Sequence, residues 1–147
     1  MKRIFKAILL CMTLVLITGC TKTISYTYEV ATGDKIKVSL NVNDGYKLTS
    51  KLPFTITKDG NELSQGTFIF GNYYDEYVNI AKEDSKTNII SSGDKDSFEY
   101  VFYSYNNKEY NYVIKIKNSN TAILLKNTNS KEEAIKCFEL LNFEVAK

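Results

Sequence analysis

The sequence predicts an α+β domain, in which an antiparallel sheet of about six or seven strands, arranged as hairpins and a meander, carries two helices. Three observations support this class. Several segments alternate apolar and polar residues with the period of two that a half-buried strand shows. In residues 73–82 the apolar spacing changes to three and four, as on one face of a helix. Ser130 and Glu133 have the spacing of a capping box, which predicts a C-terminal helix over residues 131–142, packed on the sheet.

Strand patterns dominate the first half of the chain. Residues 21–32 are small, polar or β-branched, which predicts either a first strand or an extended tether. In residues 35–42 every second residue is aliphatic, so this segment predicts a half-buried antiparallel strand. Segments 54–57 and 63–70 flank Asp59-Gly60, a pair that suits the tight turn of a β-hairpin.

The short mid-chain helix is predicted over residues 73–82. Its apolar stripe consists of Tyr74, Tyr77, Val78 and Ala81. Asn72 precedes this segment and is a residue type that caps helices. Residues 82–97 are polar and predict a loop with a short extended piece at residues 88–90.

The second half of the chain predicts a three-strand meander over residues 98–105, 110–117 and 121–126. The first of these strands is apolar or aromatic on both faces, which predicts a position in the middle of the sheet with cover on both sides. The sequence signal for the final helix becomes weak at Asn142. Its apolar stripe consists of Ala134, Cys137, Phe138 and Leu141. Cys137 on this stripe predicts a buried core thiol, with a reactive thiol as the alternative.

The first twenty residues have the organisation of an export signal. Lys2, Arg3 and Lys6 form a cationic start, and an apolar run follows up to Ile17. That run is about a dozen residues long, whereas roughly 20 are needed to span a bilayer, so an uncleaved transmembrane anchor is the less favoured alternative. We therefore expect residues 1–19 to be a signal peptide and residues 20–147 to form one extracytoplasmic domain with a short N-terminal tether.

The four residues Ile17-Thr18-Gly19-Cys20 resemble the lipobox of bacterial lipoproteins. The resemblance implies cleavage before Cys20, acylation of the Cys20 thiol, and a lipid anchor that holds the chain on the extracytoplasmic face of the cell membrane. The strand-rich layout closed by a capped helix also resembles the PsbP-like sandwich domains, in layout alone. That second resemblance implies a non-enzymatic accessory or scaffold role and transfers no functional residue.

Composition excludes several classes of function. Residues 1–19 hold three of the 19 Lys and Arg, so residues 20–147 carry 16 of them against 17 Asp and Glu. These nearly equal numbers leave no excess of positive charge of the kind that binds nucleic acid. The chain has no His, which excludes Ser-His-Asp and Cys-His catalytic arrangements and zinc sites built on imidazole. We expect no enzymatic activity, no cofactor and no metal.

Tyrosine is the residue type that stands out most, because eight of the 11 lie between Tyr73 and Tyr112. A tyrosine combines an apolar ring with a polar tip, so it suits both half-buried sheets and the recognition of glycans or protein surfaces. Tyr100 and Tyr112 fit an apolar strand face. Tyr73, Tyr103 and Tyr105 are explained less well by packing, and we predict that they contribute to a recognition surface bordered by residues 82–97.

These observations favour a lipid-anchored, non-catalytic binding or accessory module that recognises an envelope protein, a peptide or a glycan. The alternative is a cell-envelope enzyme or enzyme inhibitor, which requires a pair of carboxylates in a cleft that the sequence does not locate. A pocket with converging carboxylates favours the alternative, and an aromatic groove without them favours binding.

Overall fold

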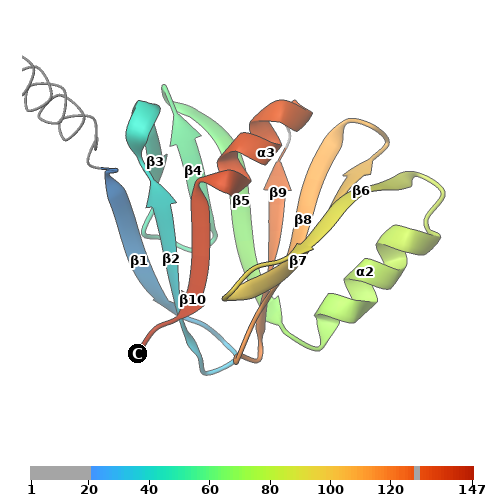
Figure 1. Ribbon diagram of the computed structural model, residues 1–147, viewed down its shortest axis with the longest axis horizontal. Coiled ribbons are helices and arrows are strands. Elements are labelled where there is room, and N and C mark those ends of the chain that lie inside the picture. Colours follow the sequence, from blue (N-terminus) through green and yellow to red (C-terminus); the bar gives the residue numbers. More distant parts are fainter. Residues whose placement is uncertain (1–20, 128–129) are drawn as a thin grey trace, which may run out of the picture.

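The protein is described by a computed structural model that covers residues 21–127 and 130–147 (Figure 1). In chain order its elements are β1 (Thr23–Glu29), β2 (Lys35–Asn41), the 3₁₀ turn η1 (Asn43–Gly45), β3 (Tyr46–Leu48), β4 (Phe54–Lys58), β5 (Asn61–Phe70), α2 (Tyr73–Glu83), β6 (Thr87–Asp94), β7 (Phe98–Tyr105), β8 (Glu109–Ile116), β9 (Thr121–Asn127), α3 (Lys131–Glu139) and β10 (Leu141–Val145). The strands form two antiparallel sheets, of order β3-β4-β5-β9-β8-β7-β6 and β1-β2-β10. The predicted α+β class is confirmed, with the second sheet as an addition to it.

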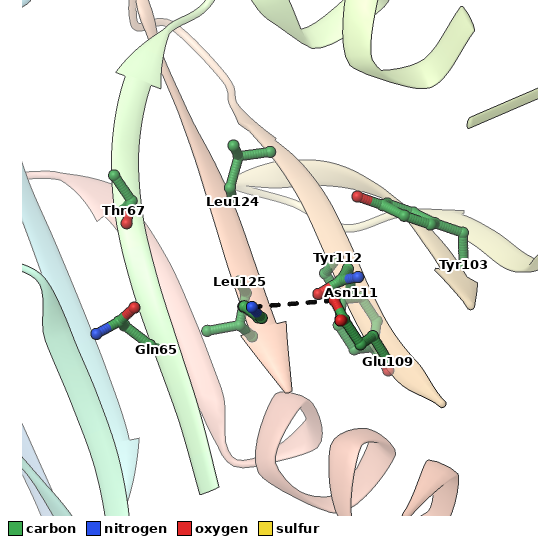
Figure 2. A pocket seen from close by; sticks show the side chains of 9 residues that line it. Gln65, Thr67, Tyr103, Glu109, Asn111, Tyr112, Leu124 and Leu125 are labelled. Atoms are coloured by element: carbon green, nitrogen blue, oxygen red, sulfur yellow. Dashed lines mark ion pairs between the residues drawn. The ribbon is translucent and has the colours of Figure 1, made fainter. Parts of the chain in front are cut away.

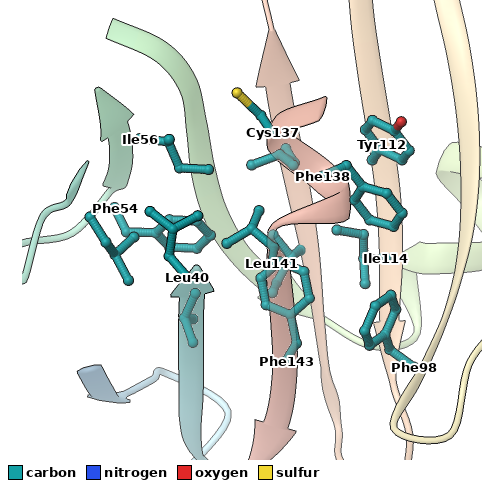
Figure 3. Packing of buried hydrophobic residues seen from close by; sticks show 14 of the residues in the cluster. Leu40, Phe54, Ile56, Phe98, Tyr112, Ile114, Cys137, Phe138, Leu141 and Phe143 are labelled. Carbon is teal, nitrogen blue, oxygen red and sulfur yellow. The ribbon is translucent and has the colours of Figure 1, made fainter. Parts of the chain in front are cut away.

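The main core lies between the two sheets, and Figure 3 shows its centre. Ile36, Val38 and Leu40 of β2 are fully buried, as their period of two predicts. Phe143 of β10 lies between two rings of the large sheet, with its centroid 6.3 Å from that of Phe54 and 5.3 Å from that of Phe98. Apolar side chains from both sheets therefore hold them face to face.

α3 covers the part of the inner face that the three-stranded sheet leaves free (Figure 1). Its Phe138 ring stacks on Tyr112 of β8 at a centroid distance of 4.0 Å. The Ser130 hydroxyl accepts a hydrogen bond from the Glu133 N–H, so this half of the predicted capping box is present. The Glu133 carboxylate instead accepts a hydrogen bond from the Tyr46 hydroxyl, at 3.0 Å, which ties α3 to β3.

The end of α3 differs from the prediction. The helix stops at Glu139 rather than at Asn142, and residues 141–145 form β10. β10 pairs antiparallel with β2, with Leu141 opposite Leu40 and Phe143 opposite Val38. The predicted helix was too long because Leu141 fits the helical stripe as well as it fits the period of two that continues through Phe143.

The predicted β4–β5 hairpin is present with the expected turn. Asp59 and Gly60 have φ values of 51° and 81°, which are the positive angles that a tight hairpin turn needs at both central positions. Further along β5, a Cβ atom on Gly66 would lie 2.0 Å from the Phe54 ring. Glycine at position 66 therefore makes room for a ring at the centre of the core.

Three other details differ from the sequence prediction or decide between its alternatives. Residues 87–94, predicted as a loop with a short extended piece, form the strand β6 at the edge of the large sheet. β7 is consequently the second strand from this edge rather than a middle strand. The prediction that it is covered on both sides holds only in part, because on its outer face Val101 is buried whereas Tyr103 and Tyr105 are half-buried. β1 is a strand rather than a tether, and it pairs with β2 over its whole length. Asn72 has a helical backbone and makes no capping side-chain hydrogen bond within the described part of the chain.

α2 lies on the outer face of the large sheet, on the opposite side from α3 (Figure 1). Tyr74 and Val78 of the helix pack on Val101, Val113 and Ala122 of three adjacent strands. This confirms that residues 73–82 form an amphipathic helix. The helix covers only part of the outer face, and the remainder of that face carries the polar row described below.

Candidate functional site

A row of side chains crosses the outer face of the large sheet at one level. The strand register places Gln65 opposite Lys126, Lys126 opposite Asn111, and Asn111 opposite Tyr103. Residues directly opposite each other in adjacent strands point to the same face. Gln65, Lys126, Asn111 and Tyr103 therefore line up across β5, β9, β8 and β7, with three polar side chains leading to one aromatic ring (Figure 2).

Two hollows lie along this row and share three residues. One has a volume of about 330 Å³ and includes Gln65, Thr67, Leu124 and Lys126. The other has a volume of about 260 Å³ and includes residues of α2 and β6 as well as Tyr105. Their shared residues are Tyr103, Glu109 and Asn111. We call these two adjacent hollows together the outer-face groove.

The side-chain amides and hydroxyls in the outer-face groove have no hydrogen-bond partners among the described residues. Gln65, Thr67 and Asn111 form no side-chain hydrogen bond with any residue that the structure describes, and the same holds for the hydroxyls of Tyr103 and Tyr105. In residues 21–127 and 130–147, the groove included, no buried side-chain nitrogen or oxygen atom lacks a hydrogen-bond partner, so these unpaired groups are accessible to solvent. The groove therefore presents free donors and acceptors to whatever enters it.

The charged groups of the groove are largely engaged already. The Lys126 ammonium lies 3.9 Å from a carboxylate oxygen of Glu109, the ion pair drawn as a dashed line in Figure 2. The Asp84 carboxylate accepts a hydrogen bond from the Lys86 N–H at 2.8 Å, which closes the turn after α2. Lys126 and Glu109 offset each other across the floor, whereas Asp84 has no ion-pair partner among the described residues, so the groove has a small net negative charge.

One tyrosine, Tyr103, stands at the junction of the two hollows. Burial raises the pKa of Tyr103 above its ordinary value, and the neighbouring Tyr77 and Glu109 raise it further. The Tyr103 phenol is therefore neutral at physiological pH and acts as a hydrogen-bond donor or acceptor. Tyr77 of α2 and Tyr105 of β7 complete an aromatic wall at this end of the groove.

The structure brings together two of the three tyrosines that the sequence nominated. Tyr103 and Tyr105 both line the groove, and Asp84 and Thr87 from the predicted bordering stretch line it with them. Tyr73 lies in the first turn of α2, where it is 44% exposed, and it does not line either hollow. Cys20, the predicted acylation site, lies outside the described residues.

The groove also contains residues that the sequence analysis did not nominate. Gln65, Asn111 and Lys126 come from three different strands, so only the lateral order of the sheet brings them together. The available sequence signal was their outward position, because each alternates with a buried neighbour along its own strand.

A separate hollow opens between the β1–β2 turn and the segment before β4. It has a volume of about 250 Å³, and Val30, Leu52, Pro53 and Phe68 are among its lining residues. It is mostly apolar, and Leu52 at its rim is 51% exposed. It has no residue in common with the predicted tyrosine surface.

No family model, curated protein or solved structure matches this chain. Within the described ranges, no group of three or more Cys, Asp or Glu side chains is placed to hold a metal ion. None of the helices in those ranges is long and apolar enough to cross a membrane.

Proposed function

We propose that the protein is a lipid-anchored, extracytoplasmic binding or accessory module without catalytic activity, and that it recognises an envelope protein, a peptide or a glycan. The observation that carries this proposal is the outer-face groove, where free amides and hydroxyls lie beside an aromatic wall. Concave sites with a few precisely placed polar groups are the usual form of ligand sites.

The geometry supports binding better than catalysis. General acid–base chemistry needs a titratable group free to exchange a proton with the substrate. In the groove, Glu109 is paired with Lys126 and Asp84 accepts a backbone hydrogen bond, so neither carboxylate is unengaged. The remaining polar groups are amides, hydroxyls and phenols, and none of these hydroxyls or phenols is hydrogen-bonded to a described carboxylate or amine that would activate it as a nucleophile.

The proposed anchor restricts where the partner must be. β1 begins at Thr23, three residues after Cys20 in the sequence. A link of that length reaches roughly 10 Å even when fully extended. Acylation of Cys20 therefore holds the domain against the outer surface of the membrane, where molecules of the cell envelope are concentrated.

A photo-crosslinking experiment in living cells tests this proposal. Benzoylphenylalanine is introduced at position 105, inside the groove, and in a matched strain at position 73, on the same outer side but outside the groove. We expect a heavier adduct from position 105 that is absent or much weaker from position 73. Equal adducts from both positions, or none from either, would contradict recognition through the groove.

A further inference from the structure

We propose that the ligand of the outer-face groove is an uncharged oligosaccharide. This inference rests on the proposed function, because it assigns a chemical class to the ligand of the same groove. Three features of the groove carry it: its free hydrogen-bonding groups, its low net charge and its tyrosine wall.

The hydrogen-bonding groups of the groove match the hydroxyls of a sugar. The side-chain amides of Gln65 and Asn111 each provide donors and an acceptor, and the Thr67 hydroxyl provides both functions in one group. None of these side chains forms a hydrogen bond with a described residue of the chain. A sugar hydroxyl also donates and accepts, so it can pair with either the NH₂ group or the carbonyl oxygen of a side-chain amide.

Charge complementarity selects against an ionic ligand. Lys126 and Glu109 lie 3.9 Å apart on the groove floor, and Asp84 adds a carboxylate at the other end. An anionic ligand is therefore repelled by two carboxylates and a cationic ligand by Lys126. A neutral ligand leaves this ion pair intact. Both partners are about half exposed, with side-chain exposures of 56% and 43%, and their outer oxygens and hydrogens remain available to hydroxyl groups.

The aromatic wall supplies the apolar contact that a sugar ring needs. Tyr103 lies next to Asn111 in the cross-strand row, and Tyr77 and Tyr105 lie around the same hollow. A tyrosine ring packs against the C–H face of a sugar while its hydroxyl reaches the solvent or the ligand. Amides at one end and rings at the other therefore fit a ligand with polar edges and apolar faces.

An extended peptide fits this groove less well. Peptides that add to a sheet use the open backbone of an edge strand. The groove crosses β5, β9, β8 and β7, which are interior strands whose backbones already pair on both sides along the row. The lining of its first hollow runs across four strands rather than along one, so it provides no row of alternating side-chain pockets for a peptide.

Side-chain amide resonances provide the test. The chain, isolated in mild detergent and labelled with ¹⁵N, is titrated into the millimolar range with neutral oligosaccharides of about two to four units. The probes are oligomers of N-acetylglucosamine, glucose, mannose and galactose, with oligogalacturonate as an anionic control and a random hexapeptide library as a peptide control. The NH₂ signals of Gln65 and Asn111 report occupation of the groove directly.

We expect at least one neutral oligomer to shift both NH₂ signals in a saturable way. Asn111→Ala and Gln65→Ala are each expected to weaken that binding by about tenfold or more, while Tyr73→Ala leaves it unchanged. Both strand residues are half-buried on the outer face of the sheet, and the melting temperature of each variant checks that its fold is intact.

Other outcomes overturn the inference and separate it from the proposed function. If the neutral sugars leave both signals unmoved while oligogalacturonate or the hexapeptides shift them, the groove is a binding site for another class and the oligosaccharide assignment is wrong. If no probe moves the signals and position 105 gives no crosslink in cells, the assignment and the proposed function both fall.

Discussion

Truncation of Phe138 tests whether α3 is an integral part of the core. The side chain is 3% exposed, and its ring stacks on Tyr112 at 4.0 Å and contacts Tyr100 at 4.6 Å. Replacing a buried Phe by Ala removes its burial and leaves a cavity, at a usual cost of about 3–5 kcal/mol. Since domains of this size have unfolding free energies of about 5–15 kcal/mol, Phe138→Ala removes a large part of the stability.

Urea unfolding followed by circular dichroism measures this loss, and two further variants sharpen it. Tyr73→Ala, at an exposed position of α2, is expected to change the unfolding free energy by less than about 0.5 kcal/mol. A double-mutant cycle between Phe138→Leu and Tyr112→Leu is expected to give a coupling of about 0.5–1.5 kcal/mol for the stacked rings. A loss below about 1 kcal/mol for Phe138→Ala would refute the view that α3 closes the core.

Three further predictions concern single residues. Cys137 is fully buried and burial raises the pKa of its thiol, so a thiol reagent is expected to label it only after denaturation; labelling of the folded chain would contradict this. Hydrogen bonds, first from Ser119 and then from Thr121, lower the pKa of Asp34, so its stabilising contribution is complete above the unfolded-state pKa and disappears as the pH falls through the folded-state value. Asp34→Asn is therefore expected to lower the melting temperature at neutral pH and to reduce the loss of stability below about pH 4, and an unchanged acid profile would disprove the role. Cells fed an alkyne-bearing palmitate should label the native chain and Cys11→Ser but not Cys20→Ser, and label on the last variant would exclude Cys20 as the lipid site.

Most elements were predictable because their signals are local. The period of two in β2, the Asp59-Gly60 turn and the helical spacing from Tyr74 to Ala81 each depend on neighbours within a few residues. β6 was missed for the opposite reason. It is an edge strand whose side chains are exposed or half-buried, so the sequence Thr-Asn-Ile-Ile-Ser-Ser-Gly-Asp has no apolar face, and pairing with β7 defines it.

The candidate site was only partly predictable for a related reason. Tyr103 and Tyr105 could be nominated as binding residues because other residues of β7 make the buried contacts of that strand. Gln65, Asn111 and Lys126 share a row only because β5 lies beside β9, a neighbour that follows it by about fifty residues in the chain. Strand order of this kind results from non-local packing, which no local pattern encodes.

The most direct test of the account measures binding and stability together in groove variants. The chain in mild detergent is tested for retention on isolated envelope fragments, and the melting temperature is recorded on the same preparations of Tyr105→Ala, Asn111→Ala and Tyr73→Ala. We predict that the two groove variants lose at least about tenfold in affinity while they melt close to the native chain, and that Tyr73→Ala keeps both properties. Unchanged binding by the groove variants, whatever their melting temperatures, would contradict recognition through the outer-face groove.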